Sequence, residues 1–360
     1  MNKMPSLLQS NSLLVTTCVI LIGFITSSSA YPHGNTIHVN SGQSIQAVID
    51  SCHGGDKIVV EAGNYTEQLS ITRDGLTLIG HNAIILPPAT PTTNNCTGLA
   101  GPGTQAGICI SGSNIVYVDQ PFDGQHRKVQ SVGDRVKDTT IKGFTVKGFS
   151  GLNIAVLGAK DASVSENTVS DGPQYGMLTV GSKNTEFKRN TITSAAGGFI
   201  GVCMDDMSSV TISQNDISAY YIGICVQTAG ADIHDNIVHD NCIGASVDPG
   251  INGAKLQNNI FNNTPAVCDP QFGVGGVLLL GATNTVVKGN VFQNMKNSGK
   301  ASGVAIVDDA SGAVASGNDV EKNTFKTNDL DIYVNTTGKG NVVKKNACLS
   351  SFPDDLCPGK

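Results

Sequence analysis

The chain has 360 residues, of which 14% are charged, and its formal net charge at pH 7 is −6. This charged fraction is well below the roughly 25% of an ordinary globular domain, and 42 glycines with no tryptophan favour tight turns and short strands over long surface helices. The sequence has no basic run with interleaved aromatic residues, so we expect no nucleic acid partner.

The first 30 residues have the pattern of a signal peptide. Lys3 precedes an apolar run from Leu13 to Ile25, and the small residues Ser28 and Ala30 fit a cleavage site after Ala30. The run is only 13 residues long, which is too short to span a bilayer. We therefore expect a secreted, extracellular monomer with no membrane span, in which residues 31–360 form a single domain.

The mature chain is predicted to begin with a capping helix at about residues 44–52. Ser44 is a suitable N-cap, and Ile45, Val48 and Ile49 have helical spacing. A helix at this position would cover strand edges that could otherwise pair with other chains. The β-rich segments after Gly55 then begin the first coils.

An internal repeat occupies the chain from about residue 141. The pattern apolar-x-x-Asn-x-apolar recurs with successive spacings of 23, 23, 25, 21, 23, 31, 33 and 23 residues from Phe144, which replaces asparagine in the earliest copy. The repeated asparagines are Asn167, Asn190, Asn215, Asn236, Asn259, Asn290, Asn323 and Asn346. This period and the short β-rich segments predict stacked coils of strands. We expect each asparagine to adopt the left-handed conformation and to hydrogen-bond to neighbouring coils in a ladder.

A second register divides side chains between the inside and the outside of the coils. About fourteen residues before a repeat asparagine stands a glycine followed by alternating residues, as in Gly201-Val-Cys-Met-Asp205 and Gly223-Ile-Cys-Val-Gln227. The first and third residues after the glycine are mostly apolar, so we assign them to the interior. The second and fourth residues are then expected to face outward.

Two insertions, at about residues 87–135 and at residues 262–275, interrupt the repeat, and a tail follows at residues 349–360. Long loops on a rigid scaffold often wall a binding cleft, and the alternative is that they are turns without function. Nine cysteines remain after removal of the signal peptide, an odd number in an oxidising compartment. The expected disulfides are Cys96–Cys109, Cys203–Cys225, Cys242–Cys268 and Cys348–Cys357, with Cys52 as the free thiol. Sequons at Asn64, Asn95, Asn262 and Asn335 predict a glycoprotein.

The segment from Ser44 to Glu67 contains the phrases Ser-Ile-Gln-Ala-Val-Ile-Asp, Gly-Asp-Lys-Ile-Val-Val and Ala-Gly-Asn-Tyr-Thr-Glu. Together with the asparagine repeats it resembles the parallel β-helix repeat proteins of the pectin-lyase-like superfamily, over nearly all of residues 36–348. The resemblance implies an all-β fold, a right-handed parallel β-helix (solenoid) with a short N-terminal capping helix. The superfamily includes lyases, hydrolases, esterases, epimerases and non-catalytic binders, so it does not define the activity.

Polar residues at the outward position of successive coils form a candidate site. Asp205, Gln227 and Asp248 are expected in one line, about 4.8 Å apart per coil. Asp206 adjoins Asp205, and two lysines occupy a shared position slightly further along the two preceding coils. We assign catalytic roles to Asp205, Asp206, Asp248 and Lys183, substrate binding to Gln227, Lys160, Tyr175 and His239, and a candidate Ca²⁺ site to Asp205 and Asp248.

Three functions fit this strip, each with a polysaccharide or oligosaccharide as partner. A lyase on an acidic, uronic-acid-containing polysaccharide needs Ca²⁺ or lysine to neutralise the substrate carboxylate, and a base to remove a proton. A glycoside hydrolase needs carboxyl groups with separated pKa values. In a non-catalytic glycan-binding or surface protein the strip only keeps the sheet soluble. Asp205-Asp206 resembles the paired aspartates of polygalacturonases, but the Gly-His and Arg-x-Lys motifs of that family are absent.

Overall fold

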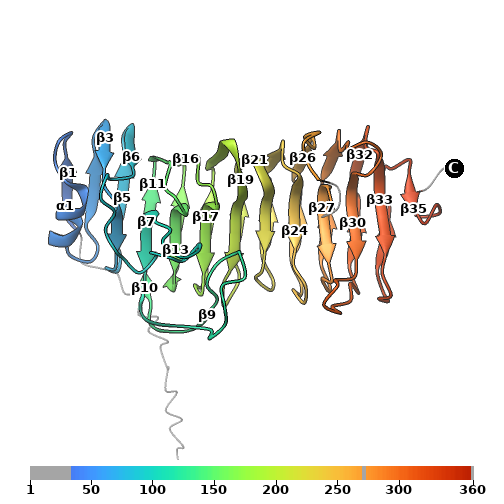
Figure 1. The fold of residues 1–360 in the computed structure, drawn as a ribbon, viewed down its shortest axis with the longest axis horizontal. Coiled ribbons are helices and arrows are strands. Elements are labelled where there is room, and N and C mark those ends of the chain that lie inside the picture. Colours follow the sequence, from blue (N-terminus) through green and yellow to red (C-terminus); the bar gives the residue numbers. More distant parts are fainter. Residues whose placement is uncertain (1–33, 270–272, 358–360) are drawn as a thin grey trace, which may run out of the picture. The chain divides into compact units, whose positions relative to one another are not determined.

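The computed structural model describes residues 34–269 and 273–357, and the predicted signal peptide lies outside these residues. The described residues form a parallel β-helix in which each coil contains short strands that pair with the coils before and after it (Figure 1). The predicted fold class, an all-β right-handed parallel β-helix with a short capping helix, is confirmed. No helix in the described part of the chain is long and apolar enough to cross a membrane.

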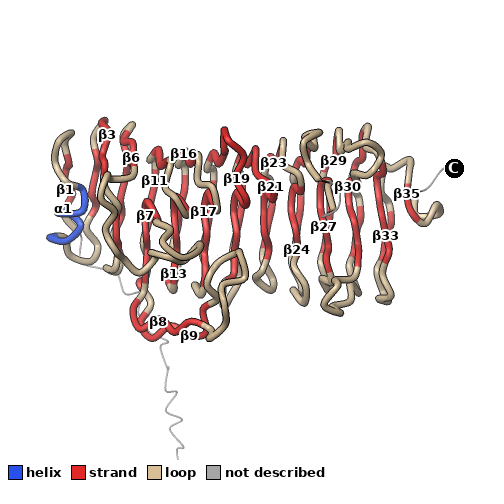
Figure 2. Tube along the Cα trace, viewed as in Figure 1, coloured by secondary structure: helices blue, strands red, loops and turns tan. Residues whose placement is uncertain are grey.

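A single short helix covers the N-terminal end of the described stack, and all other regular elements are strands (Figure 2). Helix α1 (Ile45–Ser51) starts after Ser44, whose Oγ accepts a hydrogen bond from the Ala47 N–H at 3.2 Å. Glu67 on the next coil accepts a hydrogen bond from the Ile45 N–H at 2.8 Å, so its carboxylate satisfies a second free N–H of the first turn. The buried Ile45 and Ile49 then pack onto the end of the core.

The first face of the β-helix is a 12-stranded parallel sheet. Its strands are β1 (Thr36–Val39), β2 (Lys57–Val60), β5 (Thr77–Gly80), β11 (Thr140–Lys142), β15 (Ser163–Ser165), β18 (Glu186–Lys188), β20 (Thr211–Ser213), β22 (Asp232–His234), β25 (Lys255–Gln257), β28 (Val286–Lys288), β31 (Asp319–Glu321) and β34 (Val342–Lys344).

The second and third faces belong to one 19-stranded sheet, because two long strands run through both faces. These strands are β19 (Thr191–Asp205) and β21 (Asp216–Val226). The second face also contains β3 (Gly63–Thr66), β6 (Ala83–Leu86), β12 (Thr145–Lys147), β16 (Thr168–Ser170), β23 (Ile237–His239), β26 (Ile260–Asn262), β29 (Val291–Gln293) and β32 (Thr324–Lys326). The third face also contains β4 (Leu69–Ile71), β7 (Ala106–Ser111), β13 (Leu152–Leu157), β17 (Tyr175–Val180), β24 (Ile243–Val247), β27 (Gly275–Leu280), β30 (Ser302–Val307), β33 (Leu330–Asn335) and β35 (Ser351–Phe352).

Two small strand pairs lie beside these faces. An antiparallel hairpin is formed by β8 (Ser113–Tyr117) and β9 (Val129–Asp134), and it projects from the lower edge of the stack in Figure 1. A short parallel pair is formed by β10 (Val136–Lys137) and β14 (Ala159–Lys160). The hairpin is the far part of the first predicted insertion.

Apolar side chains from all three faces fill the interior of the coils. The rings of Phe261, Phe292 and Phe325 stack in consecutive coils, with centroids 5.1 and 5.0 Å apart. The inward residues of the third face, such as Met204 and Val226, belong to the same buried cluster. The inward and outward assignment predicted from the sequence is therefore confirmed for this face.

The repeat asparagines form the predicted ladder. The Oδ1 atom of Asn215 accepts hydrogen bonds from the backbone N–H and the Nδ2 of Asn190, at 2.9 and 3.0 Å. The Nδ2 of Asn215 donates to the carbonyl of Phe187 and to the Oδ1 of Asn236, at 2.9 and 3.0 Å. The ladder begins at the N–H of Phe144, which donates to Asn167, so the copy without asparagine is the first rung. Each buried amide satisfies backbone groups that would otherwise lack a partner.

The expected left-handed conformation of the repeat asparagines is wrong. The residue before each asparagine has the positive φ, as at Glu166 (57°), Arg189 (54°) and Gln214 (57°). The asparagine itself points its amide into the coil, where the ladder fixes it. Asparagine is therefore required here for its hydrogen bonds and not for its backbone conformation.

Candidate active site

The predicted polar line on the third face is present. The backbone pairs Met204 with Val226 and Val226 with Val247, so the following residues Asp205, Gln227 and Asp248 stand side by side on successive coils. The Nε2 of Gln227 donates to the Oδ2 of Asp248 at 2.6 Å. Because successive coils are about 4.8 Å apart, the two aspartates are separated by about 10 Å, with Gln227 between them.

The first insertion folds over the outward surface of the third face. Cys96, Leu99 and Ala100 of the insertion form a second apolar cluster with outward residues of β13 and β17, such as Leu157 and Leu178. Strand β7 lies within the predicted insertion but pairs with β4 and β13 of the third face, so the predicted insertion is interrupted by a strand of the β-helix. The Cys96–Cys109 disulfide attaches the segment before β7 to that strand. The outward apolar residues of these coils are thus buried, and residues 126–128 of the insertion lie beside Asp205.

Residues 125–128 of the insertion supply three partners to the polar line. The Nε2 of His126 and the Nζ of Lys128 lie 3.1 and 3.2 Å from the Oδ2 of Asp205. Lys128 also donates a hydrogen bond to the Oε1 of Gln227, and the Nε2 of Gln227 donates to the Oε1 of Gln125 at 2.6 Å. All hydrogen-bonding groups of the Gln227 amide are therefore occupied, and its orientation is fixed.

His126 is buried, and its two nitrogens have different partners. Burial lowers the pKa of the His126 imidazole below its ordinary value, in spite of the hydrogen bond to Asp205. Its Nδ1 lies 3.1 Å from the hydroxyl of Tyr175, and burial raises the pKa of that phenol. A neutral imidazole then accepts a hydrogen bond from the Tyr175 hydroxyl at Nδ1 and donates a hydrogen bond from Nε2 to Asp205.

The two aspartates of the line have opposite pKa shifts. Burial raises the pKa of Asp248, and the hydrogen bonds from Gln227 and Ser246 offset this only in part. Burial also acts to raise the pKa of Asp205, but the His126 hydrogen bond and the charge of Lys128 more than offset it and hold the pKa below its ordinary value. The environment therefore favours the ionised form of Asp205 more than that of Asp248.

Asp206, to which we assigned a catalytic role, points away from this line. Its Oδ2 accepts hydrogen bonds from the hydroxyls of Thr179 and Thr185 at 2.7 and 2.8 Å, and its Oδ1 accepts one from the Ser182 N–H at 2.8 Å. Burial raises the pKa of Asp206 to about 6. These hydrogen bonds join the Asp206 carboxylate to the preceding coil, where it satisfies buried donors and does not face the polar line.

The structure separates three further predicted residues from the aspartates. The backbones of Lys160 and Lys183 form a parallel bridge at the turn beyond the third face. The Nζ of Lys160 lies 3.7 Å from the carboxylate of Asp161. His239 lies on β23 of the second face, between Asp216 at 2.9 Å and Asp240 at 2.6 Å. Of the predicted binding residues, Gln227 and Tyr175 are at the site.

Three of the four carboxylate oxygens of the two aspartates have described contacts. The Oδ2 of Asp205 contacts Lys128 and His126, while Asp248 accepts hydrogen bonds at Oδ2 from Gln227 and, at 3.1 Å, at Oδ1 from the hydroxyl of Ser246. In the described part of the chain, no group of three or more His, Cys, Asp or Glu residues is arranged to hold a metal ion. The donor set at this site does not fit the Ca²⁺ that we predicted.

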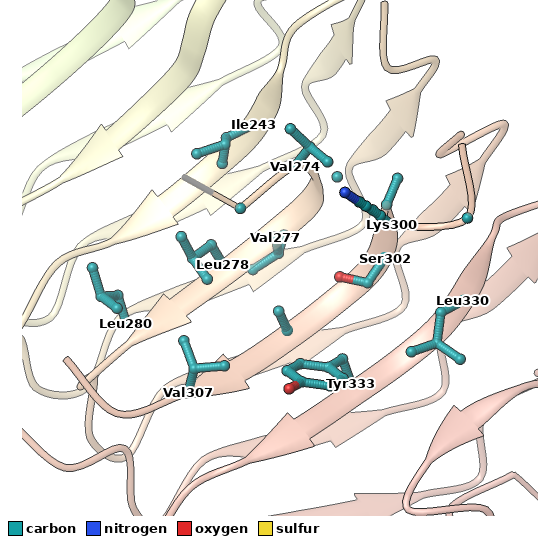
Figure 3. A pocket seen from close by; sticks show the side chains of 15 residues that line it. Ile243, Val274, Val277, Leu278, Leu280, Lys300, Ser302, Val307, Leu330 and Tyr333 are labelled. Atoms are coloured by element: carbon teal, nitrogen blue, oxygen red, sulfur yellow. The ribbon is translucent and has the colours of Figure 1, made fainter. Parts of the chain in front are cut away.

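A groove opens on the third face at Asp248. Its first part is a cavity of about 770 Å³ lined by Gln125, Phe199, Tyr221, Ser246 and Asp248, among others. The rings of Phe199 and Tyr221 are stacked, with centroids 6.5 Å apart. A second cavity of about 530 Å³ follows along β27, β30 and β33, and the two cavities share Ile243, Leu278 and Leu280 (Figure 3).

Three predicted disulfides are confirmed, namely Cys96–Cys109, Cys242–Cys268 and Cys348–Cys357. Cys52 is free, as expected, but Cys203 and Cys225 are also free. Their sulfur atoms lie 2.8 Å apart on neighbouring strands of the third face, below Asp205 and Gln227.

We expect mild oxidation to join Cys203 and Cys225. Paired strands place Cα atoms about 4.8 Å apart, within the range for a disulfide. Oxidised glutathione should convert the two thiols to a disulfide and release two reduced glutathione molecules. Mass spectrometry should then find one cross-linked peptide pair containing both residues, and Cys203→Ser should abolish it. Glutathione adducts on both cysteines without a cross-link would contradict this expectation.

Solved structures of the same fold are similar to this chain. A DFA-IIIase from Arthrobacter chlorophenolicus A6, in complex with GF2, is 12% identical, with 92% of this chain and 95% of that chain covered and a TM-score of 0.55. An alginate lyase from Paenibacillus sp. str. FPU-7 is 14% identical, with 82% and 99% covered and a TM-score of 0.51. At these identities the likeness concerns the fold. No curated protein sequence is significantly similar to the chain.

The sequence also matches a family profile described as periplasmic copper-binding protein (NosD) at residues 92–271 and 201–351. These matches together cover more than half of the chain. The chain therefore belongs to the NosD family of β-helix proteins.

Proposed function

We propose that this protein is a secreted glycoside hydrolase in which Asp248 is the general acid and Asp205 the general base. The observation that carries the proposal is the pair of carboxyl groups with opposite pKa shifts on one polar line, of which Asp248 also lines the open groove. Acid–base cleavage of a glycosidic bond requires one protonated and one ionised carboxyl group, and the raised pKa of Asp248 and the lowered pKa of Asp205 favour this division. The stacked Phe199 and Tyr221 offer an apolar surface on which a sugar ring can lie.

The reaction would proceed with inversion. Asp248 donates its proton to the oxygen of the leaving group, while Asp205 removes a proton from a water molecule that attacks the anomeric carbon. Inverting enzymes place these carboxyl groups roughly 6.5–9.5 Å apart to leave room for that water, and the two-coil spacing of about 10 Å between the backbones of Asp205 and Asp248 is slightly longer. A quarter of the Asp205 side chain is exposed, which leaves it open to water.

A lyase acting on an acidic polysaccharide has less support. That mechanism needs a cation free to neutralise a substrate carboxylate. Lys183 forms no described contact with Asp205 or Asp248, and Lys128 is already paired with Asp205. The alginate lyase has a similar fold, but the described residues around Asp205 and Asp248 offer no free cation for an acidic polysaccharide such as alginate.

Copper binding, which the family description names, is also not supported for this chain. Copper sites need imidazole or sulfur ligands gathered around one point. The described residues contain no group of three or more His, Cys, Asp or Glu with that arrangement. Three disulfides and the family description both support an exported protein.

The proposal is tested with a panel of glycosides and polysaccharides, including pectate and alginate. Release of reducing ends without new absorbance near 235 nm supports hydrolysis. New absorbance near 235 nm on an acidic polymer would instead support the lyase. Binding without turnover of any substrate would identify a glycan-binding protein and reject the proposed reaction.

The pH dependence of the reaction follows from the two shifts. Asp205 must be ionised, so activity is lost only as the pH falls through its lowered pKa; Asp248 must be protonated, so activity is lost as the pH rises through its raised pKa. We expect a bell-shaped profile with an acidic optimum. Lys128→Gln removes a charge that stabilises ionised Asp205, and should move the acid limb to higher pH.

The matched control is Lys183→Gln, which removes a lysine that does not contact the aspartates. Its profile should equal that of the unchanged protein. An acid limb that stays in place in Lys128→Gln would show that Asp205 is not the base.

A further inference from the structure

Several outward residues of the third face beyond Asp248 are apolar, up to Asn335 on β33. Leu278 and Leu280 on β27, Val307 on β30 and Tyr333 on β33 are only half-buried. Outward residues of a sheet that meets water are usually polar. Over the preceding coils the outward apolar residues are covered by the first insertion, and in the described residues nothing equivalent covers these four.

This apolar strip is concave. Figure 3 shows Leu278, Leu280, Val307 and Tyr333 lining one cavity, with Lys300 at its side. Its volume of about 530 Å³ is within the range of small-molecule sites. Through Leu278 and Leu280 it continues into the cavity that contains Asp248.

Polar and apolar groups are segregated along the groove. The side chains able to hydrogen-bond with sugar hydroxyls, such as Gln125, Ser246 and Asp248, gather at one end. The other end offers mostly aliphatic side chains, and its polar side chains are Lys300, Ser302 and Tyr333. Lys300 is the single cation among the described residues that line the two cavities, so a polyanion lacks charge partners here.

We propose that the groove binds a neutral glycoside with an apolar aglycone, with the sugar at Asp248 and the aglycone on Leu278, Leu280, Val307 and Tyr333. This inference rests on the proposed hydrolase function and names its substrate class. A neutral polysaccharide would need hydrogen-bonding groups along the whole groove, whereas an amphiphilic molecule matches the division into one polar and one apolar end.

The test compares methyl and octyl glucosides as probes. By isothermal titration calorimetry, below the micelle concentration of the octyl compound, octyl glucoside should bind at least tenfold more tightly than methyl glucoside. Each buried methylene contributes about fourfold, so burial of two methylenes is enough for this difference. The double variant Leu280→Asn with Val307→Asn should remove this difference. Val342→Ser, which changes an exposed valine on the first face, should retain it.

For any glycoside that is cleaved, kcat/KM should rise with the length of an alkyl aglycone. Cleavage that does not depend on alkyl length, or equal binding of both glucosides, would overturn this inference and leave the hydrolase proposal intact. Tight binding of octyl glucoside with no cleavage of any glycoside would instead reject the hydrolase proposal. It would also reject the inference that the glycoside bound in the groove is a substrate. If the double variant only converts a dimer to a monomer in sedimentation, the groove binds a second copy of the chain, and the inference fails.

Discussion

Asp248→Asn is expected to lower kcat by about 10²–10⁴-fold on any glycoside that the protein cleaves, because asparagine has no proton to give to the leaving group. The amide has the same shape as the carboxyl group, so contacts with Gln227 and Ser246 remain possible and KM should change little. Asp205→Asn should lower kcat by a similar factor through loss of the base. Initial rates of reducing-end release measure both effects.

Leaving-group chemistry separates the two roles. An activated aryl glycoside needs little protonation of its leaving oxygen, so it should recover much of the lost rate in Asp248→Asn but not in Asp205→Asn. Asp206→Asn is the matched control, since it changes the adjacent carboxyl group, whose described hydrogen bonds come from the preceding coil. Its activity per folded molecule should be unchanged, and an equal loss in all three variants would contradict the assignment.

Asn215→Ala is expected to lower the free energy of unfolding by about 3 kcal/mol or more. The substitution removes the acceptor for the Asn190 N–H and the donor to the Phe187 carbonyl, both in the interior. Each buried polar group left without a partner costs about 1–3 kcal/mol. Chemical denaturation followed by circular dichroism measures the loss.

Asn335→Ala serves as the control for the ladder, because Asn335 is exposed. Its unfolding free energy should stay within about 0.5 kcal/mol of the unchanged protein. A similarly small change in Asn215→Ala would show that the ladder does not stabilise the coils.

The fold and the ladder follow from local sequence because they repeat. Each coil places apolar residues and one asparagine at fixed positions. An assignment that is ambiguous in one copy of the repeat can therefore be decided by comparison with the other copies. The sequence could not show that Glu166, rather than Asn167, takes the left-handed conformation, because both fit the turn and only the hydrogen bonds with Asn190 decide.

The site was predictable only where it belongs to the repeat. The line of Asp205, Gln227 and Asp248 follows from the outward register, but His126 and Lys128 come from an insertion without periodicity. Their positions depend on the Cys96–Cys109 disulfide and on apolar packing against distant coils. The cluster of His126, Arg127 and Lys128 near the end of that insertion was the one sequence feature that could have indicated a contribution to the site. Lys160 and Lys183 share one position on neighbouring coils, as predicted, but this position lies at the turn after the strand, where no described contact joins Lys183 to Asp205 or Asp248.

The most direct test of the central claim is product analysis in water enriched in ¹⁸O. For the unchanged protein acting on a glycoside panel, we predict one ¹⁸O atom at the anomeric position of the released sugar, no unsaturated sugar, and loss of this product in both Asp205→Asn and Asp248→Asn. An unsaturated product without ¹⁸O, or the same ¹⁸O-labelled product at undiminished rate from the two variants, would contradict it.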